Sequence, residues 1–216
     1  MWKHPEYSSS SIWMGWSYGQ DNLQSHSLVQ RLPFLNTPFV HYAYAHQIHT
    51  DEIFFVEQEG MQGKCDALYT NTKGIALVVQ TADCVPVFLV GDSEIAVVHA
   101  GWKGIALDIV GKTIAKLSNV HTAIIGPCIG VQSYQVGEEV VDAIVKTGID
   151  PAIFVDRTLS NKPHVNVRQA VHAQIQRRDI THIESPNLCS YSDINWASYR
   201  RNPANTGRIL SVIGLL

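Results

Sequence analysis

Residues 74–104 decide the fold, and they read GIALVVQTADCVPVFLVGDSEIAVVHAGWKG. Two apolar runs of strand length, 74–80 and 85–90, come first. The turn signal Gly91-Asp92-Ser93-Glu94 then leads into a third apolar run, 95–99. We expect the runs on either side of this turn to pair as an antiparallel hairpin, which would form the centre of a sheet.

The chain around this hairpin alternates between strand-like and helix-like segments. After His99 the apolar residues recur with helical spacing, which predicts a helix over 105–117 entered through Gly101-Trp102-Lys103-Gly104. The other expected elements are strands over 39–45, 53–57, 123–125 and 208–216 and helices over 137–146 and 165–177. Antiparallel strands separated from helices favour the α+β class over a regular βαβ series.

Composition restricts the class of protein. The chain has 216 residues, of which 45% are hydrophobic and 16% charged, so it is expected to fold as one domain over 1–216 and not to be disordered. The formal charge is -3 and there is no basic block, which argues against nucleic acid as a partner. No apolar run approaches the roughly 20 residues of a membrane span, and no signal-peptide pattern begins the chain. We therefore expect a cytoplasmic protein with no membrane contact.

Three groups of metal-type or nucleophile-type side chains lie where apolar runs stop. They are His46-Gln47-Ile48-His49, Thr81-Ala82-Asp83-Cys84, and His99 with the segment that follows it. The four cysteines of the chain are sparse and are expected to be free thiols, so Cys84 is free to act as a ligand or nucleophile. Two imidazoles and one thiolate suit Zn²⁺ and leave its fourth position open. In isolation, a histidine near a core strand is more often a hydrogen-bonded structural residue, and a buried cysteine more often acts as a small hydrophobic residue.

The residues alone leave the choice between His46 and His49 open. If both lay in a strand they would face opposite sides, so only one of them would enter the site. Asp83 beside Cys84 is a candidate for proton transfer, with a turn aspartate as the structural alternative. Lys103 at the start of the expected helix is a candidate for phosphate binding, and so is the pair Arg200 and Arg201. Arg208 supplies a further cation, and Lys103 is also a catalytic candidate.

Several motifs in register resemble one known family. They are Cys65-Asp66-Ala67-Leu68-Tyr69-Thr70, Thr81-Ala82-Asp83-Cys84-Val85-Pro86-Val87, His99-Ala100-Gly101-Trp102-Lys103-Gly104, Ile125-Gly126-Pro127-Cys128-Ile129-Gly130, Tyr134-Gln135-Val136-Gly137 and Ser198-Tyr199-Arg200-Arg201 with Gly207-Arg208. The chain resembles the YfiH-like, or laccase-domain, proteins, which were first labelled multicopper polyphenol oxidases and are now read as zinc-dependent purine nucleoside phosphorylases with additional adenosine deaminase activity. The resemblance covers about residue 40 to the C-terminus.

The resemblance has implications for fold and site. It implies one α+β domain with mixed β-sheets packed together and helices outside. It also implies that His49, Cys84 and His99 are the metal ligands, which selects His49 over His46. The chain departs from the family at several points. Residues 1–38 form a divergent, shortened N-terminal part without the Thr-Arg-x-Gly-Gly element, and Thr50, Lys103 and Ser190 stand where glycine, arginine and threonine are usual.

The function expected from these observations is phosphorolysis of a purine nucleoside. Adenosine, inosine or methylthioadenosine would react with phosphate to give the free base and ribose 1-phosphate or its methylthio form, with adenosine deamination as a second activity. A non-catalytic nucleoside-binding protein and a copper-dependent polyphenol oxidase are the alternatives for the same site. A covalent mechanism with Cys84 as nucleophile and His99 as its base is a further hypothesis.

Overall fold

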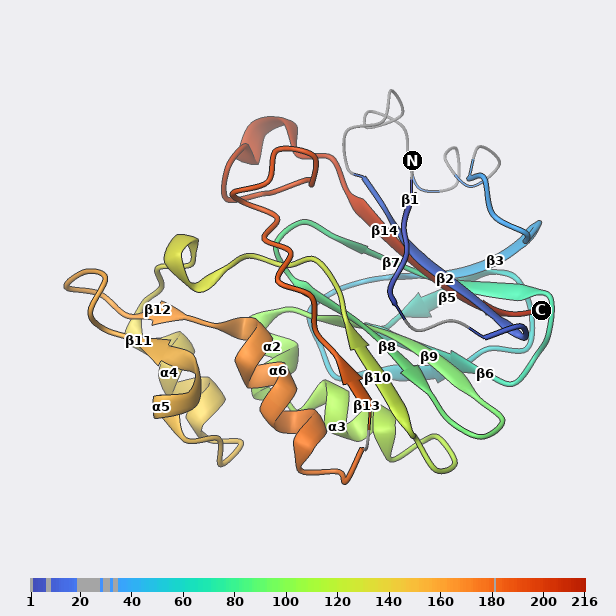
Figure 1. The fold of residues 1–216 in the computed structure, drawn as a ribbon, viewed down its shortest axis with the longest axis horizontal. Helices are drawn as coiled ribbons and strands as arrows, with labels where there is room; N and C mark the ends of the chain where they lie inside the picture. Colours follow the sequence, from blue (N-terminus) through green and yellow to red (C-terminus); the bar gives the residue numbers. More distant parts are fainter. Residues whose placement is uncertain (1, 7–8, 19–27, 29–31, 33–34, 181) are drawn as a thin grey trace.

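The computed structural model describes residues 2–6, 9–18, 28, 32, 35–180 and 182–216. These residues form two six-stranded mixed sheets and a small two-stranded one, with the helices gathered at the lower left in Figure 1. In spatial order, sheet A contains β1 (Trp2–Lys3), β2 (Ile12–Ser17), β14 (Ile209–Leu215), β7 (Ile75–Thr81), β3 (His41–His46) and β5 (Gly60–Lys64). Sheet B contains β13 (His182–Glu184), β10 (Thr122–Ile125), β8 (Val85–Val90), β9 (Ile95–Ala100), β6 (Ala67–Thr70) and β4 (Ile53–Phe55). The small sheet pairs β11 (Val155–Asp156) with β12 (His164–Val165).

Sheet B is the middle layer, and both of its faces are buried. Along β8, Val85, Val87 and Leu89 belong to the core shared with the helices, whereas Phe88 and Val90 belong to the core shared with sheet A. Every residue of β8 is buried, which explains why its sequence is a continuous apolar run without the alternation of a half-exposed strand. The α+β class and the packed mixed sheets are confirmed.

The predicted hairpin is confirmed and sets the position of the site. β8 and β9 are antiparallel, with Val85 opposite Ala100 and Pro86 opposite His99. Cys84 immediately precedes β8, so it lies at the same end of the sheet as His99. The hairpin register therefore brings together two residues that are far apart in the sequence.

The described helices lie on the side of sheet B that points away from sheet A. They are α2 (Trp102–Ala106), α3 (Ile109–Ile114), α4 (Glu138–Val145), α5 (Pro151–Phe154) and α6 (Val167–Gln176). Helices α2, α3 and α6 contact strands of sheet B, whereas α4 packs on α2 and α5 packs on α6. The expectation of one helix over 105–117 is wrong, because Asp108 adopts a left-handed conformation with φ of 58° and separates α2 from α3. The last helix begins after Asn166, whose side chain accepts a hydrogen bond from the backbone N–H of Gln169 (3.1 Å).

The segment expected to be divergent, 1–38, is described only in part. Its strand β2 pairs with β14 and so extends sheet A, while residues 1, 7–8, 19–27, 29–31 and 33–34 lie outside the described residues. Among the helices that the structure describes, none has the length and apolar character needed to cross a membrane.

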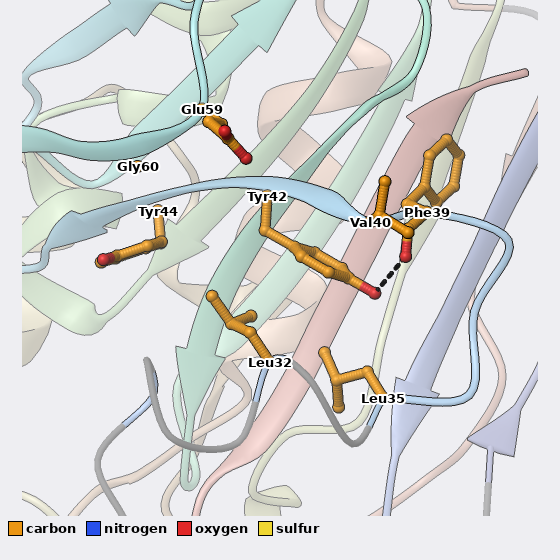
Figure 2. A pocket seen from close by; sticks show the side chains of 8 residues that line it. All are labelled: Leu32, Leu35, Phe39, Val40, Tyr42, Tyr44, Glu59 and Gly60. Atoms are coloured by element: carbon orange, nitrogen blue, oxygen red, sulfur yellow. Dashed lines mark hydrogen bonds between the residues drawn. The ribbon is translucent and has the colours of Figure 1, made fainter.

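A cavity of about 520 Å³ lies on the outer face of sheet A (Figure 2). Its walls are mostly apolar, and the Tyr42 hydroxyl donates a hydrogen bond to the Phe39 carbonyl there (2.9 Å). None of the residues nominated from the sequence lines this cavity. Several of the nominated residues, such as Cys84 and His99, line a different cavity.

Candidate functional site

The three predicted metal ligands lie together at one end of the stacked sheets. One ligand atom from each of His49, Cys84 and His99 lies within 4.8 Å of the other two. His49 follows β3, Cys84 occupies the loop between β7 and β8, and His99 belongs to β9. Ligand atoms around a tetrahedral zinc ion are about 3.5 Å apart, so a small inward movement of the side chains would complete a three-ligand site. The nitrogen and sulfur donors fit zinc, and the ligand assignment itself is a proposal.

A buried carboxylate, Asp66, holds two of these ligands in place. Its oxygens accept hydrogen bonds from the backbone N–H groups of Ile48 (3.2 Å), His49 (3.1 Å) and Thr50 (2.7 Å) and from the Thr50 hydroxyl (2.9 Å). Nδ1 of His99 donates to the same carboxylate (2.7 Å), which leaves Nε2 of His99 as the ligand atom. Asp66 thus fixes the loop that carries His49 and the ring orientation of His99.

Asp66 was not nominated from the sequence as a functional residue. The available signal was an aspartate between Cys65 and the apolar start of β6, which is an unfavourable place for an unpaired charge. The Thr50 hydroxyl adds one of the bonds to Asp66, which a residue without a side-chain donor at this position would not supply.

Mutual electrostatics set the ionisation of the metal-free site. Burial alone would raise the pKa of Cys84, but the charge on His99 and hydrogen bonds with His49 and His99 lower it to about 6. Burial would lower the pKa of His99, but Cys84 and Asp66 raise it to about 9. Burial likewise opposes ionisation of Asp66, yet hydrogen bonds from His99 and Thr50 bring its pKa to about 2. Cys84 is therefore a thiolate at neutral pH, which is the form that binds metal.

Gly101 allows the ligands to approach one another. A Cβ atom at this position would lie 2.7 Å from Cδ2 of His49 and 3.2 Å from Sγ of Cys84. Because the first distance is shorter than carbon–carbon contacts allow, any side chain at Gly101 would displace His49. Gly101 is thus required for the packing of the site, in addition to its place as the N-cap of α2.

The three predicted ligands lie in the wall of a pocket of about 720 Å³. Aromatic side chains of Trp102, Tyr134 and Tyr199 and the cationic side chains of Arg200 and Arg208 also line it. This volume is typical of pockets that bind small molecules, and the combination of rings with cations suits a flat base attached to an anion-binding region.

Asp83 links the pocket wall to the loop that carries Arg200. It has a positive φ of 88° in the turn between β7 and β8, and it is only 9% exposed. One carboxylate oxygen accepts from the Ser190 hydroxyl (2.7 Å) and the other from the Arg200 backbone N–H (2.7 Å). The guanidinium of Arg200 lies 5.3 Å from the Tyr134 ring centre and donates to the Gln135 carbonyl (3.0 Å).

The structure does not place Lys103 and Arg201 at this pocket. The Lys103 ammonium lies 5.7 Å from the ring centre of Trp102, and neither Lys103 nor Arg201 lines the cavity. The guanidinium of Arg201 instead donates to the backbone carbonyls of Ser190 (2.8 Å) and Tyr191 (2.7 Å), so it holds the loop together. Of the three phosphate-binding residues predicted, Arg200 is the one that reaches the pocket.

His46 and His49 differ in their backbone surroundings. The two residues do not share a strand, because β3 ends at His46 and His49 lies in the following loop with a left-handed φ of 61°. His46 lines the pocket but is not part of the three-residue ligand group. The resemblance, and not the strand periodicity, selected the histidine that lies beside Cys84.

Replacing Cys84 with serine separates a metal role from a packing role. We expect metal content well below one ion per chain, because the soft, charged ligand is gone, whereas the free energy of unfolding of the metal-free protein should change by only about 1 kcal/mol. His49→Ala and His99→Ala should also lose metal, and His46→Ala is the matched control that should keep it. Metal analysis and denaturation of each variant make the measurement. A Cys84→Ser protein with full metal content would exclude the site.

Metal affinity should rise with pH. At pH 7 the metal-free site holds a proton on His99, since its pKa is raised to about 9, and this proton must leave before Nε2 can bind a metal. The apparent affinity for Zn²⁺ should therefore increase roughly tenfold per pH unit between about pH 6 and 9 and level off above that range. Competition with a chelator of known affinity at several pH values measures this slope. An affinity independent of pH over this range would contradict the assigned protonation state.

Comparisons with known proteins identify the family to which the chain belongs. Residues 7–216 match the family described as multi-copper polyphenol oxidoreductase laccase. A purine nucleoside phosphorylase of Bacteroides thetaiotaomicron is 37% identical over 170 residues, which are 72% of this chain and 62% of that protein. A purine nucleoside phosphorylase of Haemophilus influenzae is 32% identical over 194 residues, covering 86% of this chain and 78% of its own length.

The fold has a counterpart among solved structures. The crystal structure of the hypothetical protein YfiH of Bacillus licheniformis superimposes with a TM-score of 0.83 at 25% identity, over 95% of this chain and 93% of that one. The resemblance read from the motifs is thus confirmed by a family match over almost the whole chain and by the shared fold. The chain belongs to the multi-copper polyphenol oxidoreductase laccase family, which includes the YfiH proteins.

Proposed function

We propose that this chain is a zinc-dependent purine nucleoside phosphorylase. The observation that carries the proposal is one pocket in which a His-Cys-His group, aromatic rings and two arginines meet. The names of the two curated relatives support the same activity. Adenosine, inosine and methylthioadenosine are the proposed substrates together with inorganic phosphate.

Different residues of the pocket suit different parts of the proposed substrates. The rings of Trp102 and Tyr134 offer flat apolar faces for the purine, and the guanidinium groups of Arg200 and Arg208 offer paired donors for phosphate oxygens. Holding phosphate next to the sugar turns a bimolecular reaction into one between neighbours in a single pocket. Bound zinc would supply a Lewis acid with an open coordination position.

The hydrogen bonds of Asp83 favour a role in positioning the loop that carries Arg200. Both of its carboxylate oxygens accept hydrogen bonds, one of them from the backbone N–H of Arg200, so its removal would release the loop that brings Arg200 to the pocket. This role differs from the proton transfer expected from the sequence, in which Asp83 would exchange a proton with the departing purine. Lys103 and Arg201 are left out of the proposed phosphate site because neither lines the pocket.

Product analysis tests the proposal against its alternatives. Zinc-loaded protein is incubated with each nucleoside with and without phosphate, and base, sugar phosphate and ammonia are separated and quantified. We expect base and ribose 1-phosphate only when phosphate is present. Ammonia release from adenosine would support the proposed second activity as a deaminase. Base release without phosphate would contradict phosphorolysis, and nucleoside binding without product would favour the non-catalytic alternative.

The copper alternative is tested in the same preparation. Polyphenol oxidation requires a redox-active metal, whereas zinc has no redox chemistry. Metal analysis of protein prepared without added copper, followed by assays with zinc alone, distinguishes the two. Activity that appears only with copper would contradict the zinc assignment.

Replacing Arg200 with glutamine tests the phosphate site. We expect the KM for phosphate to rise by about tenfold to a hundredfold, since a charge-assisted donor pair is lost, while zinc content stays at the level of the unchanged protein. Arg157→Gln is the matched control, because Arg157 forms an exposed ion pair with Glu138 and does not line the pocket. Steady-state kinetics at varied phosphate make the measurement. An unchanged KM for phosphate in Arg200→Gln would remove Arg200 from the site.

A further inference from the structure

Two cysteines other than Cys84 are paired on neighbouring backbone segments. Cys128 and Cys189 form an isolated parallel bridge, in which the Cys128 N–H donates to Leu188 (3.2 Å) and the Ser190 N–H donates to Cys128 (2.9 Å). Directly paired residues of neighbouring strands lie about 4.8 Å apart with their side chains on one side, within the roughly 4.4–6.8 Å between Cα atoms that a disulfide spans. Both residues are free thiols in the structure.

The environments of the two thiols differ. Cys189 is partly exposed, and its Sγ accepts hydrogen bonds from the backbone N–H groups of Gly130 (3.2 Å) and Ser192 (3.5 Å). Burial opposes ionisation of Cys189, but hydrogen bonds from the Ser192 side chain and from the backbone N–H groups of Ser192, Gly130 and Tyr191 outweigh this effect and lower its pKa. Cys128 is fully buried, and burial raises its pKa to about 11. A partly exposed thiol whose ionisation is favoured by hydrogen bonds therefore lies beside a protected thiol, as in a reactive and resolving pair.

We propose that Cys189 is a peroxide-reactive cysteine that forms a reversible disulfide with Cys128. The Cys189 thiolate attacks one oxygen of hydrogen peroxide, the O–O bond breaks, and the released hydroxide takes up a proton to become water. This step oxidises Cys189 to a sulfenic acid. Sγ of Cys128 then displaces the hydroxyl group, which leaves with the Cys128 proton as a second water. A dithiol reductant then reduces the disulfide to the two thiols by thiol–disulfide exchange.

The disulfide would change the pocket through Asp83. The residue after Cys128, Ile129, donates its N–H to the Asp83 carbonyl (3.0 Å), and the residue after Cys189, Ser190, donates its hydroxyl to the Asp83 carboxylate (2.7 Å). Formation of the disulfide would pull Sγ of Cys189 away from the N–H groups of Gly130 and Ser192. The same movement would shift the neighbouring Ser190. Asp83 would then hold Arg200 less firmly. This consequence rests on the proposed function, whereas the thiol chemistry does not.

The chemistry is tested on the zinc-loaded protein, in which Cys84 is protected as a ligand. The protein is treated with a small excess of hydrogen peroxide, remaining thiols are alkylated, and proteolytic peptides are analysed by mass spectrometry. We expect a Cys128–Cys189 cross-linked peptide that disappears on reduction. In Cys128→Ser a sulfenic acid should accumulate on Cys189 and react with dimedone, and in Cys189→Ser no cross-link should form. Cys65→Ala is the matched control and should cross-link like the unchanged protein.

Three outcomes would overturn the proposal. They are oxidation of Cys84 ahead of Cys189, oxidation of Cys189 beyond sulfenic acid with no cross-link, and a Cys189 that stays reduced at peroxide concentrations that oxidise a free thiol. The effect on the pocket is measured as phosphate affinity, which should fall roughly tenfold on cross-linking and recover on reduction. A cross-link without this change would overturn the coupling to Asp83. If the reduced protein binds no phosphate, the proposed function fails, and the peptide analysis still decides the thiol chemistry.

Discussion

The buried carboxylate of Asp66 is the constraint on which the proposed metal site of His49, Cys84 and His99 depends. Five hydrogen bonds converge on a side chain that is 1% exposed, from three consecutive backbone N–H groups, the Thr50 hydroxyl and the ring of His99. A charge at this depth is stable only because each oxygen is satisfied, so the loop at His49 and the orientation of His99 are fixed together. The ring of His99 and the backbone that carries His49 are therefore held in place by the protein itself.

The layered fold supplies the rest of the site. Because sheet B is covered on one face by sheet A and on the other by helices, its central strands do not shift in register without exposing apolar side chains. The register of β8 and β9 places Cys84 across from Gly101, and the glycine leaves the space in which the ligands meet. Pocket residues from loops are thereby attached to a rigid double-layered support, which suits the proposed role of holding a nucleoside and phosphate in one geometry.

The central strands were predictable from sequence because both of their faces are buried. The run 85–90 gave the bounds of β8 without error, whereas the helical pattern over 105–117 did not show the break at Asp108. That break is a left-handed backbone conformation at a single residue, which leaves no mark on hydrophobic spacing. Strand pairing between distant segments, such as β2 with β14, likewise depends on the folded chain and not on local pattern.

The site was predictable to a lesser degree. Side-chain chemistry nominated a His-Cys-His group, but only the family resemblance distinguished His49 from His46, because the residues gave no sign that β3 ends at His46. The role of Asp66 arises from contacts across 16 to 33 residues of sequence and could not be read locally. Arg200 and Arg201 are adjacent in the sequence and have the same side chain. Only the folded loop shows that Arg200 lines the pocket, whereas Arg201 donates to backbone carbonyls of its own loop.

X-ray absorption at the zinc edge tests the central claim most directly, because it reports the atoms bound to the metal without relying on any reaction. The measurement is made on protein stripped with a chelator and reloaded with one equivalent of Zn²⁺. The structure predicts one sulfur at about 2.3 Å and two imidazole nitrogens at about 2.0 Å, with a light atom in the fourth position. A spectrum without sulfur, or with two sulfur ligands, would contradict a centre built from His49, Cys84 and His99.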